Sequence, residues 1–369
     1  MKTYTVSLPS YTIGEDAYKS IPEVCKFYGK NAVVIGGKIA MQKTHDFLLK
    51  GVENSQINIT DFIWYGGDAS YANGDKLIND ERVKNADMLF VVGGGRACDC
   101  GKYVADVLEK PVFTFPTVAS NCASVTQICV MYNEDGSFCN YYYPKKLANH
   151  AFINSAVIAD SPEKLLWAGI GDALSKECEV IFSSKYADLF HTTLMGRQMS
   201  RICTSPLLTY GKKALDDIKA KKPSFELDQV TLDIIISTGI VSNLTTTADD
   251  YYYNSSIAHM VYNGTTVTKN AHNHLHGEVV SLGVLCLLTF DKNFEERDKV
   301  MKFNASVGLP VCFGDIEVEQ SDFEAIAEKA TKTTEWAHRA PEANITKETL
   351  IACMKETDEC GKKFKKENA

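Results

Sequence analysis

The segment LFVVGGGRACDCGKYVADVLEK, residues 89–110, decides the fold. It has the pattern of an apolar strand, then the glycines Gly93–Gly95, then a helix that we expect to begin near Cys98 or Asp99. Three glycines let backbone N–H groups approach a phosphate, and the N-terminus of the following helix favours an anion. Since this is neither G-x-G-x-x-G nor a Walker loop, a tight turn without a ligand stays open as the alternative.

The other strand-like runs of the N-terminal part lie on either side of this segment, separated by helix-like stretches. Their near-continuous apolarity is typical of strands buried on both faces. Strands that alternate with helices predict βαβ units and a parallel sheet. With the glycine-rich segment, the runs are NAVVIGG from Asn31, INITDFIWYGG from Ile57, DMLFVVGGG from Asp87, PVFTFPT from Pro111 and AVIAD from Ala156.

The sequence pattern changes at Ser161–Pro162, where proline ends the preceding strand and serine can cap a helix. From Leu165 onward, segments with helical periodicity such as ALDDIKAKK and FEAIAEKATKTTEWAHRA replace the strand-like runs. A chain of 369 residues also exceeds the usual size of one hydrophobic core. We therefore predict an α/β domain over residues 1–161 and an all-α domain over residues 162–369.

A second turn, PTVASNCASVTQICVMY, follows the strand that ends at Phe115. Its small and hydroxylated residues suit close contact with a nucleotide, or they simply fill a loop. Two such turns at the carboxyl ends of neighbouring parallel strands describe a ligand crevice. Each turn alone is ambiguous, but the pair favours a dinucleotide.

Composition excludes several other classes of protein. The net charge is −8 with a pI of about 5.6, and Lys and Arg do not cluster with aromatic residues, so we expect no nucleic-acid partner. The N-terminus lacks the apolar core of a signal peptide, and the longest apolar run, from Val279, is too short and polar to cross a bilayer. Twelve scattered cysteines suit a reducing compartment. We expect a cytoplasmic protein without a membrane partner.

The run HNHLHGEVVSLGVLCLL, residues 272–288, places His272, His274 and His276 against an apolar stretch. Positions i and i+4 share a helix face whereas i and i+2 do not, so the spacing alone does not assign all three to one metal ion. A hydrogen-bonded structural role remains open for each. Asp172 in GIGDALSKECE, at what looks like the opening of a helix, and His259 in SSIAHMVYNGT complete an oxygen and nitrogen set that suits Zn²⁺ or Fe²⁺ with a position left for a substrate.

Five motifs occur in the order GGG-x-x-x-D, PT-x-AS, GIGDAL, AH-x-x-x-NG and HG. This order resembles the glycerol dehydrogenase branch of the iron-containing alcohol dehydrogenase superfamily, over roughly residues 8–355. The resemblance implies an N-terminal Rossmann-like α/β domain, an all-α C-terminal domain that binds a metal ion, and hydride transfer between them; dehydroquinate synthase shares this fold. It also implies a small-molecule substrate, and we expect a homo-oligomer.

By this resemblance the metal ligands are Asp172, His259 and His276, because His276 directly precedes Gly277 as the last ligand of the family precedes its glycine. His272 and His274 then lie near the site, where we expect one of them to pass a proton to solvent. The implied cofactors are NAD or NADP and one Zn²⁺ or Fe²⁺. The residues implied to contact the nucleotide are Gly94, Gly95, Asp99, Thr117, Ser120, Thr126, Ile128 and Tyr132.

Two departures from the family pattern bear on specificity. Glycerol dehydrogenases carry an aspartate for a polyol hydroxyl where this chain has Cys122, a poor acceptor, and a cysteine there resembles the hydroxycarboxylate dehydrogenase subgroup. We therefore expect a 2-oxo acid or aldehyde, with its neighbouring group near Asn121 and Cys122. Gly37 and Lys38 stand where many NAD-preferring relatives have an acid, so we expect NADP to be tolerated.

Three other functions remain open from the sequence. Glycerol dehydrogenase is the first, if another group accepts the polyol. A lyase of the dehydroquinate synthase type needs several basic residues for a phosphorylated substrate, and the metal-site segments offer mainly Lys176 and Lys269. A non-catalytic nucleotide-binding protein is disfavoured by the three-ligand set.

Overall fold

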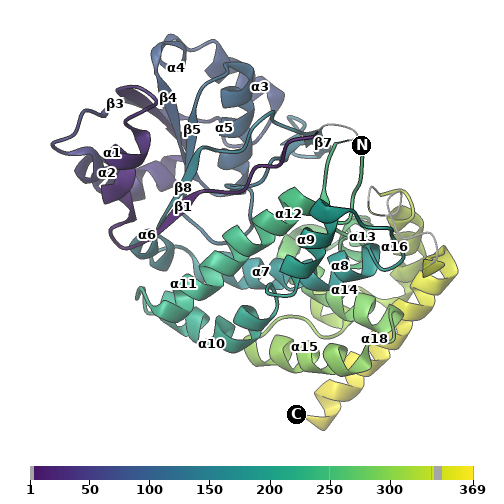
Figure 1. The fold of residues 1–369 in the computed structure, drawn as a ribbon. Coiled ribbons are helices and arrows are strands. Elements are labelled where there is room, and N and C mark those ends of the chain that lie inside the picture. The colour runs from purple at the N-terminus through teal and green to yellow at the C-terminus, as the bar shows by residue number, and fades with distance from the viewer. Residues whose placement is uncertain (1–3, 249, 334, 336–342, 369) are drawn as a thin grey trace. The chain divides into compact units, whose positions relative to one another are not determined.

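The computed structural model describes residues 4–248, 250–333, 335 and 343–368 (Figure 1). The chain forms two compact units: unit 1 comprises Met1–Leu166 and Lys213–Asn243, and unit 2 comprises Trp167–Lys212 and Leu244–Ala369. Residues 213–243, which we expected in the second domain, thus pack with unit 1. As a division of function, the domains 1–161 and 162–369 stay a prediction.

Unit 1 is built on a six-stranded sheet in which every pairing is parallel, as the βαβ pattern predicts. The strand order is β1-β8-β5-β4-β2-β3, so the glycine-rich strand β4 lies inside the sheet. A separate antiparallel ribbon pairs β6 with β7. The strands are β1 Tyr11–Gly14, β2 Asn31–Gly36, β3 Asn58–Trp64, β4 Met88–Gly93, β5 Val112–Pro116, β6 Cys129–Tyr132, β7 Phe138–Tyr142 and β8 His150–Asn154.

Side chains of β4 alternate between the two faces of the sheet, which explains why this strand is buried throughout. Leu89 and Val91 belong to one apolar cluster with α5, whereas Phe90 and Val92 belong to the other with α2. Figure 1 shows α3 and α5 on one side of the sheet and α1 and α2 on the other. The elements are η1 Ala17–Ser20, α1 Ile21–Cys25, α2 Lys38–Val52, α3 Tyr71–Ile78, α4 Glu81–Asn85, α5 Gly95–Val107, α6 Ser155–Ala159, α11 Phe225–Leu232 and the π-helix η2 Asp233–Ser237.

One predicted strand is wrong: the run AVIAD from Ala156 forms helix α6, and the strand β8 lies just before it. Asn154 ends the strand and starts the helix, because its side chain accepts the backbone N–H groups of Ala156 (3.0 Å) and Val157 (3.1 Å). A short apolar run does not distinguish a strand from a buried helix, so the cap decided the outcome.

Unit 2 is helical, with one isolated bridge between Thr246 and Tyr252 among its described residues, as the all-α prediction requires. The elements that form it in whole or in part are α7 Glu163–Ala173, α8 Ser175–Ser183, α9 His191–Ser200, α10 Ser205–Lys219, α12 Thr238–Thr245, α13 Ile257–Thr265, η3 Ala271–Asn273, α14 His276–Phe290, α15 Phe294–Val307, η4 Phe313–Ile316, η5 Gln320–Asp322, α16 Phe323–Ala330 and α18 Lys347–Glu367. The predicted helix FEAIAEKATKTTEWAHRA begins as α16, and residues 334 and 336–340 of it lie outside the described part.

Helix α14 forms the centre of unit 2. It packs against α8, α13, α15 and α18, and it is buried on nearly all sides from Gly277 to Thr289. A helix that is apolar all round is stable only inside a core. The apolar run that follows the histidines is therefore an internal helix of this unit. In the part of the chain that the structure describes, every helix is too short or too polar to cross a membrane.

The cap at Asn154 gives a stability prediction. We expect Asn154→Ala to lower the free energy of unfolding by about 1–2 kcal/mol, because two amides at the start of α6 lose their acceptor. Asn154 also donates to the carbonyl oxygen of Glu15 (2.8 Å), which adds to the loss. Urea unfolding would measure it. The control is Asn293→Ala at the start of α15, where the side chain makes no cap bond; an equal loss there would contradict the assignment.

Candidate functional site

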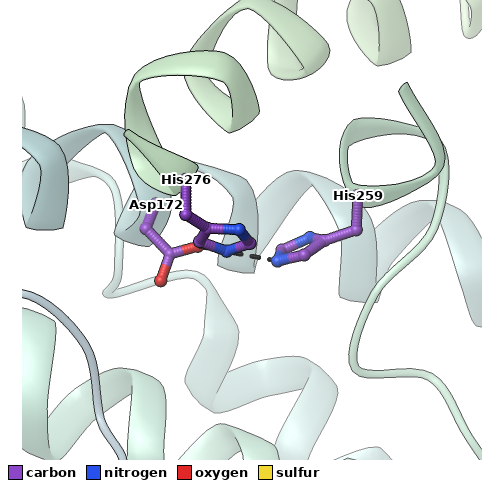
Figure 2. A group of neighbouring side chains, drawn as sticks. All are labelled: Asp172, His259 and His276. Carbon is purple, nitrogen blue, oxygen red and sulfur yellow. Dashed lines mark ion pairs between the residues drawn. The ribbon is translucent and has the colours of Figure 1, made fainter. Parts of the chain in front are cut away.

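The side chains of Asp172, His259 and His276 come together in unit 2, from helices α7, α13 and α14 (Figure 2). One ligand atom from each lies within 4.8 Å of the others. Nε2 of His276 is 3.2 Å from Oδ1 of Asp172, and Nε2 of His259 is 3.5 Å from the same oxygen. His272 and His274 are outside this group.

Asp172 lies near the end of α7, not at the opening of a helix as its sequence context suggested. Gly171, directly before it, lies inside α7 and serves a close helix contact. A Cβ added at Gly171 would overlap the carbonyl oxygen of Gly277, and one added at Gly277 would overlap the carbonyl oxygen of Ala168. The backbones of α7 and α14 therefore touch, and this contact brings Asp172 beside His276.

His259 is oriented by Glu179, a residue of α8 that the sequence analysis did not single out. Nδ1 of His259 is 2.7 Å from Oε2 of Glu179, whose other oxygen accepts the backbone N–H groups of Ser256 (2.7 Å) and His259 (3.0 Å). Glu179 is fully buried. A carboxylate on Nδ1 fixes the orientation of the ring and directs Nε2 toward Asp172, the arrangement typical of histidine metal ligands. A single glutamate gives no such signal in sequence.

The electrostatics of the group favour a cation. Burial opposes the charge on Asp172, but His276 and His259 outweigh it and hold the pKa of this carboxyl well below its usual range. Burial also opposes the charge on Glu179, yet His259 lowers its pKa. Against the effect of burial, Glu179 and Asp172 raise the pKa of His259 to about 10. Two ionised carboxylates around two imidazoles suit Zn²⁺ or Fe²⁺ by donor type.

Of the remaining histidines of the run, His274 supports the start of α14. Nδ1 of His274 is 2.9 Å from Glu278, and its Nε2 is 3.4 Å from Glu317. Glu278 also accepts the N–H of Leu275 and so caps the helix on which His276 is the first residue. His272 is exposed on η3. The proton path through His272 or His274 stays a prediction.

In unit 1, the turns that follow β2, β4 and β5 meet at the carboxyl ends of these strands. Helix α5 begins at Gly95 with Gly94 as its cap, earlier than expected. The N–H of Gly37 donates to Val92 (3.3 Å), a Cβ on Gly93 would lie 3.9 Å from the nitrogen of Gly37, and one on Gly95 would lie 2.7 Å from Nδ2 of Asn121. The glycine turn is therefore flanked by both neighbouring turns.

The residues predicted to contact the nucleotide fall into two groups. Asp99, Thr117 and Thr126 are buried, whereas Ser120, Ile128 and Tyr132 are half-buried on the loop after β5 or on β6. Asn121 and Cys122, which are predicted to face the substrate, are half-buried on the same loop. Thr117 donates its N–H to Gly93 (3.2 Å), and the Tyr132 ring lies under Arg96, 4.8 Å from its guanidinium carbon. Their contact with a nucleotide stays a prediction.

Lys102 joins the two predicted nucleotide segments and was missed by the sequence analysis. Its buried ammonium is 3.0 Å from Asp99 and donates to the carbonyl oxygens of Thr126 (2.9 Å) and Ile128 (2.7 Å). Asp99 in turn accepts the N–H of Val130 (3.1 Å). Asp99 therefore has partners within unit 1, and the Asp99–Lys102 pair holds the loop after β5 in place. The lysine three positions after the aspartate was the signal available in the sequence.

Comparison with known proteins agrees with this arrangement. Residues 9–155 match the family described as iron-containing alcohol dehydrogenase. The chain is 29% identical to a glycerol dehydrogenase from Thermotoga maritima over 98% of both chains, and 27% identical to hydroxycarboxylate dehydrogenase A from Escherichia coli strain K12 over 75% of this chain and 76% of that one. The crystal structure of a glycerol dehydrogenase from Schizosaccharomyces pombe superposes with a TM-score of 0.87 at 22% identity, over 100% and 93% of the two chains.

The family match and the relatives named glycerol dehydrogenases support an alcohol oxidoreductase, and the solved structure agrees in fold. The resemblance of the chain to the glycerol dehydrogenase branch of the iron-containing alcohol dehydrogenases is confirmed, by the family match over residues 9–155 and by the similarity to glycerol dehydrogenases over nearly the whole chain.

The contact between α7 and α14 can be tested at Gly277. We expect Gly277→Ala to lower the free energy of unfolding by about 1–3 kcal/mol and to weaken zinc binding, because a methyl group there forces the two backbones apart. Denaturant unfolding and zinc titration of the metal-stripped protein would measure both effects. Gly314→Ala is the control, since the nearest atom to its added Cβ is a Cys312 sulfur at 4.0 Å. Unchanged zinc affinity in Gly277→Ala would contradict the role of this contact.

Proposed function

We propose that this chain is a metal-dependent dehydrogenase that transfers hydride between NAD(P)(H) and a small alcohol or carbonyl compound, with Asp172, His259 and His276 as the metal ligands. The observation that carries the proposal is the oriented ligand set. His259 has its second ring nitrogen fixed by buried Glu179, and α14 presents His276 from its first turn beside Asp172. Acidic and histidine side chains that merely lie together on a surface would not require a buried carboxylate to orient them.

The residues around the proposed metal ion have separate roles in the reaction. When bound, the divalent ion supplies a Lewis acid for the substrate oxygen, and the nicotinamide gives or accepts the hydride. Asp172 contributes negative charge, while His259 and His276 fix the ligand geometry, so none of the three has to act as a base. Tyr262 packs edge-on against the ring of His276, at 4.2 Å between centroids, and limits its rotation.

The nucleotide is assigned to the carboxyl edge of the sheet in unit 1. The adjoining glycine turns at Gly37 and Gly93–Gly95 leave backbone accessible to a pyrophosphate, and α5 begins there. The first turn of α2 carries no acid that would repel a 2′-phosphate. Both NAD(H) and NADP(H) are therefore accepted.

The proposed substrate is a 2-oxo acid or a small aldehyde, with its neighbouring group near Asn121 and Cys122. Cys122 replaces the carboxylate acceptor of glycerol dehydrogenases, and hydroxycarboxylate dehydrogenase A is among the relatives of the chain. The alternative is glycerol, because several relatives over nearly the whole chain are glycerol dehydrogenases. Self-association into a homo-oligomer stays a prediction.

The metal assignment is tested by removing one ligand at a time. We expect His259→Ala and His276→Ala each to lower kcat about 100-fold or more, beyond the loss typical for an outer-shell partner, and to lose bound metal. Binding of NAD⁺, measured by calorimetry, should stay within about twofold because its proposed contacts lie in unit 1. His191→Ala, an exposed histidine of unit 2, is the control. Full activity in either ligand variant would refute the site.

The substrate assignment is tested by restoring the acceptor. We expect Cys122→Asp to shift the ratio of kcat/KM toward glycerol and away from 2-oxo acids by about tenfold, since the new carboxylate accepts a hydroxyl proton and repels the substrate carboxylate. The control is Cys139→Asp, an exposed cysteine of unit 1. If the unaltered protein oxidises glycerol as efficiently as it reduces its best 2-oxo acid, the chain is a glycerol dehydrogenase with another polyol acceptor.

A further inference from the structure

We propose that Trp64 holds the ammonium group of Lys38 in place as a binding site for the 2′-phosphate of NADP(H), which makes Trp64 a positioning residue for nucleotide choice. The inference rests on the proposed function, because it assumes a nicotinamide nucleotide along the carboxyl edge of the sheet. Tolerance of NADP(H) requires only that the 2′-phosphate is not repelled. This inference requires that the 2′-phosphate measurably increases the affinity of the protein for the nucleotide.

The geometry of the pair is specific. Lys38 is the first residue of α2, and Trp64 is the last residue of β3, where it is the register partner of Gly36. The lysine nitrogen lies 4.3 Å from the centroid of the indole ring, well within the range of a cation–π contact. Trp64 is 47% exposed, so the pair stands at the surface of unit 1. A lysine that would otherwise be mobile is held at one place.

The position of the pair agrees with the path of a dinucleotide. The turn at Gly37 adjoins the glycine turn after β4, the assigned place of the pyrophosphate. Strands β2 and β3 are the next two strands of the sheet on that side. A nucleotide that runs from the glycine turn over β2 puts its adenosine ribose beside Gly37 and Lys38, where a basic residue accommodates a 2′-phosphate.

The neighbouring charges leave Lys38 available to an anion. The acid of α2, Asp46, lies 2.9 Å from His45, and the acid of β3, Asp61, lies 3.8 Å from Arg82. Lys43 on the same helix is paired with Asp160. Asp68, in the turn after β3, is held by Arg96 at 3.2 Å. Indole binds an ammonium group without neutralising it, so the charge of Lys38 remains for a phosphate.

The space at Gly37 supports the same conclusion. A Cβ added there would have Ala40 Cβ at 3.7 Å and Tyr65 Cε1 at 3.9 Å as its nearest neighbours, both ordinary contacts. Glycine is therefore not required by packing at this position, and the absence of a side chain keeps the approach to Lys38 open. An acid would fit there, and this chain does not have one.

The test measures nucleotide affinity by calorimetry on the full chain, with 2′,5′-ADP, 5′-AMP, NADP⁺ and NAD⁺ as probes. Lys38→Met should weaken NADP⁺ and 2′,5′-ADP about tenfold and leave NAD⁺ and 5′-AMP within about twofold. Trp64→Leu should weaken the two 2′-phosphorylated probes about three- to tenfold, and Trp64→Phe should retain most of the affinity because its ring still binds the ammonium group. Lys43→Met is the matched lysine control.

Each outcome bears on the inference. Equal losses for phosphorylated and unphosphorylated probes, or no loss in Lys38→Met, would overturn it. Equal affinities in Trp64→Phe and Trp64→Leu would remove the role of the indole ring. If the unaltered protein binds NAD⁺ but not NADP⁺, the inference and the acceptance of NADP(H) fail, while the proposed dehydrogenase function stands with NAD(H); if it binds neither nucleotide, the proposed function fails as well. Thermal unfolding of each variant separates a lost contact from a lost fold.

Discussion

The contact between the backbones of α7 and α14 is the constraint on which the candidate metal site depends. Gly171 and Gly277 have no side chains, so the two helices approach until backbone meets backbone. Asp172 follows the first glycine and His276 precedes the second, so the closest point of the helix pair is also the place where their side chains meet. Any side chain at either glycine would separate the carboxylate from the imidazole. The apolar length of α14 fixes this geometry by burying the helix among its neighbours.

Each unit also contains a buried charge that positions a functional segment. In unit 2, Glu179 accepts from the ring of His259 and from two backbone amides. In unit 1, Lys102 donates to two carbonyl oxygens of the loop after β5 while Asp99 balances its charge. A buried charge without partners is costly, so these contacts have to form together. The fold thereby fixes the ring of a proposed ligand and the loop that carries Cys122 with groups that need not touch a substrate themselves.

The motifs from which we predicted the chemistry serve different structural purposes. The three glycines after β4 serve close contact with the turns on either side, including the side chain of Asn121. The histidine run combines one proposed metal ligand with a capping cluster, since His274 and Glu278 fix the helix start from which His276 projects. Residues that are adjacent in sequence thus have separate tasks. Their spacing alone could not separate these tasks, because it leaves open which residues share a partner.

The sequence by itself determined the parallel sheet and the helical C-terminal part, because apolar periodicity is a local property of a chain. Through the order of its motifs it also singled out Asp172, His259 and His276, which the structure brings together. It misassigned the run at Ala156 and the place of Asp172 in its helix, since a cap and a helix contact decide those points. Tertiary structure alone revealed Glu179, Lys102 and Trp64, and it moved residues 213–243 to unit 1. The reason is that each of these acts through a partner on another element, about 25 to 80 residues away for the three side chains. Pairing over such separations is set by packing and leaves no periodic trace in a single sequence.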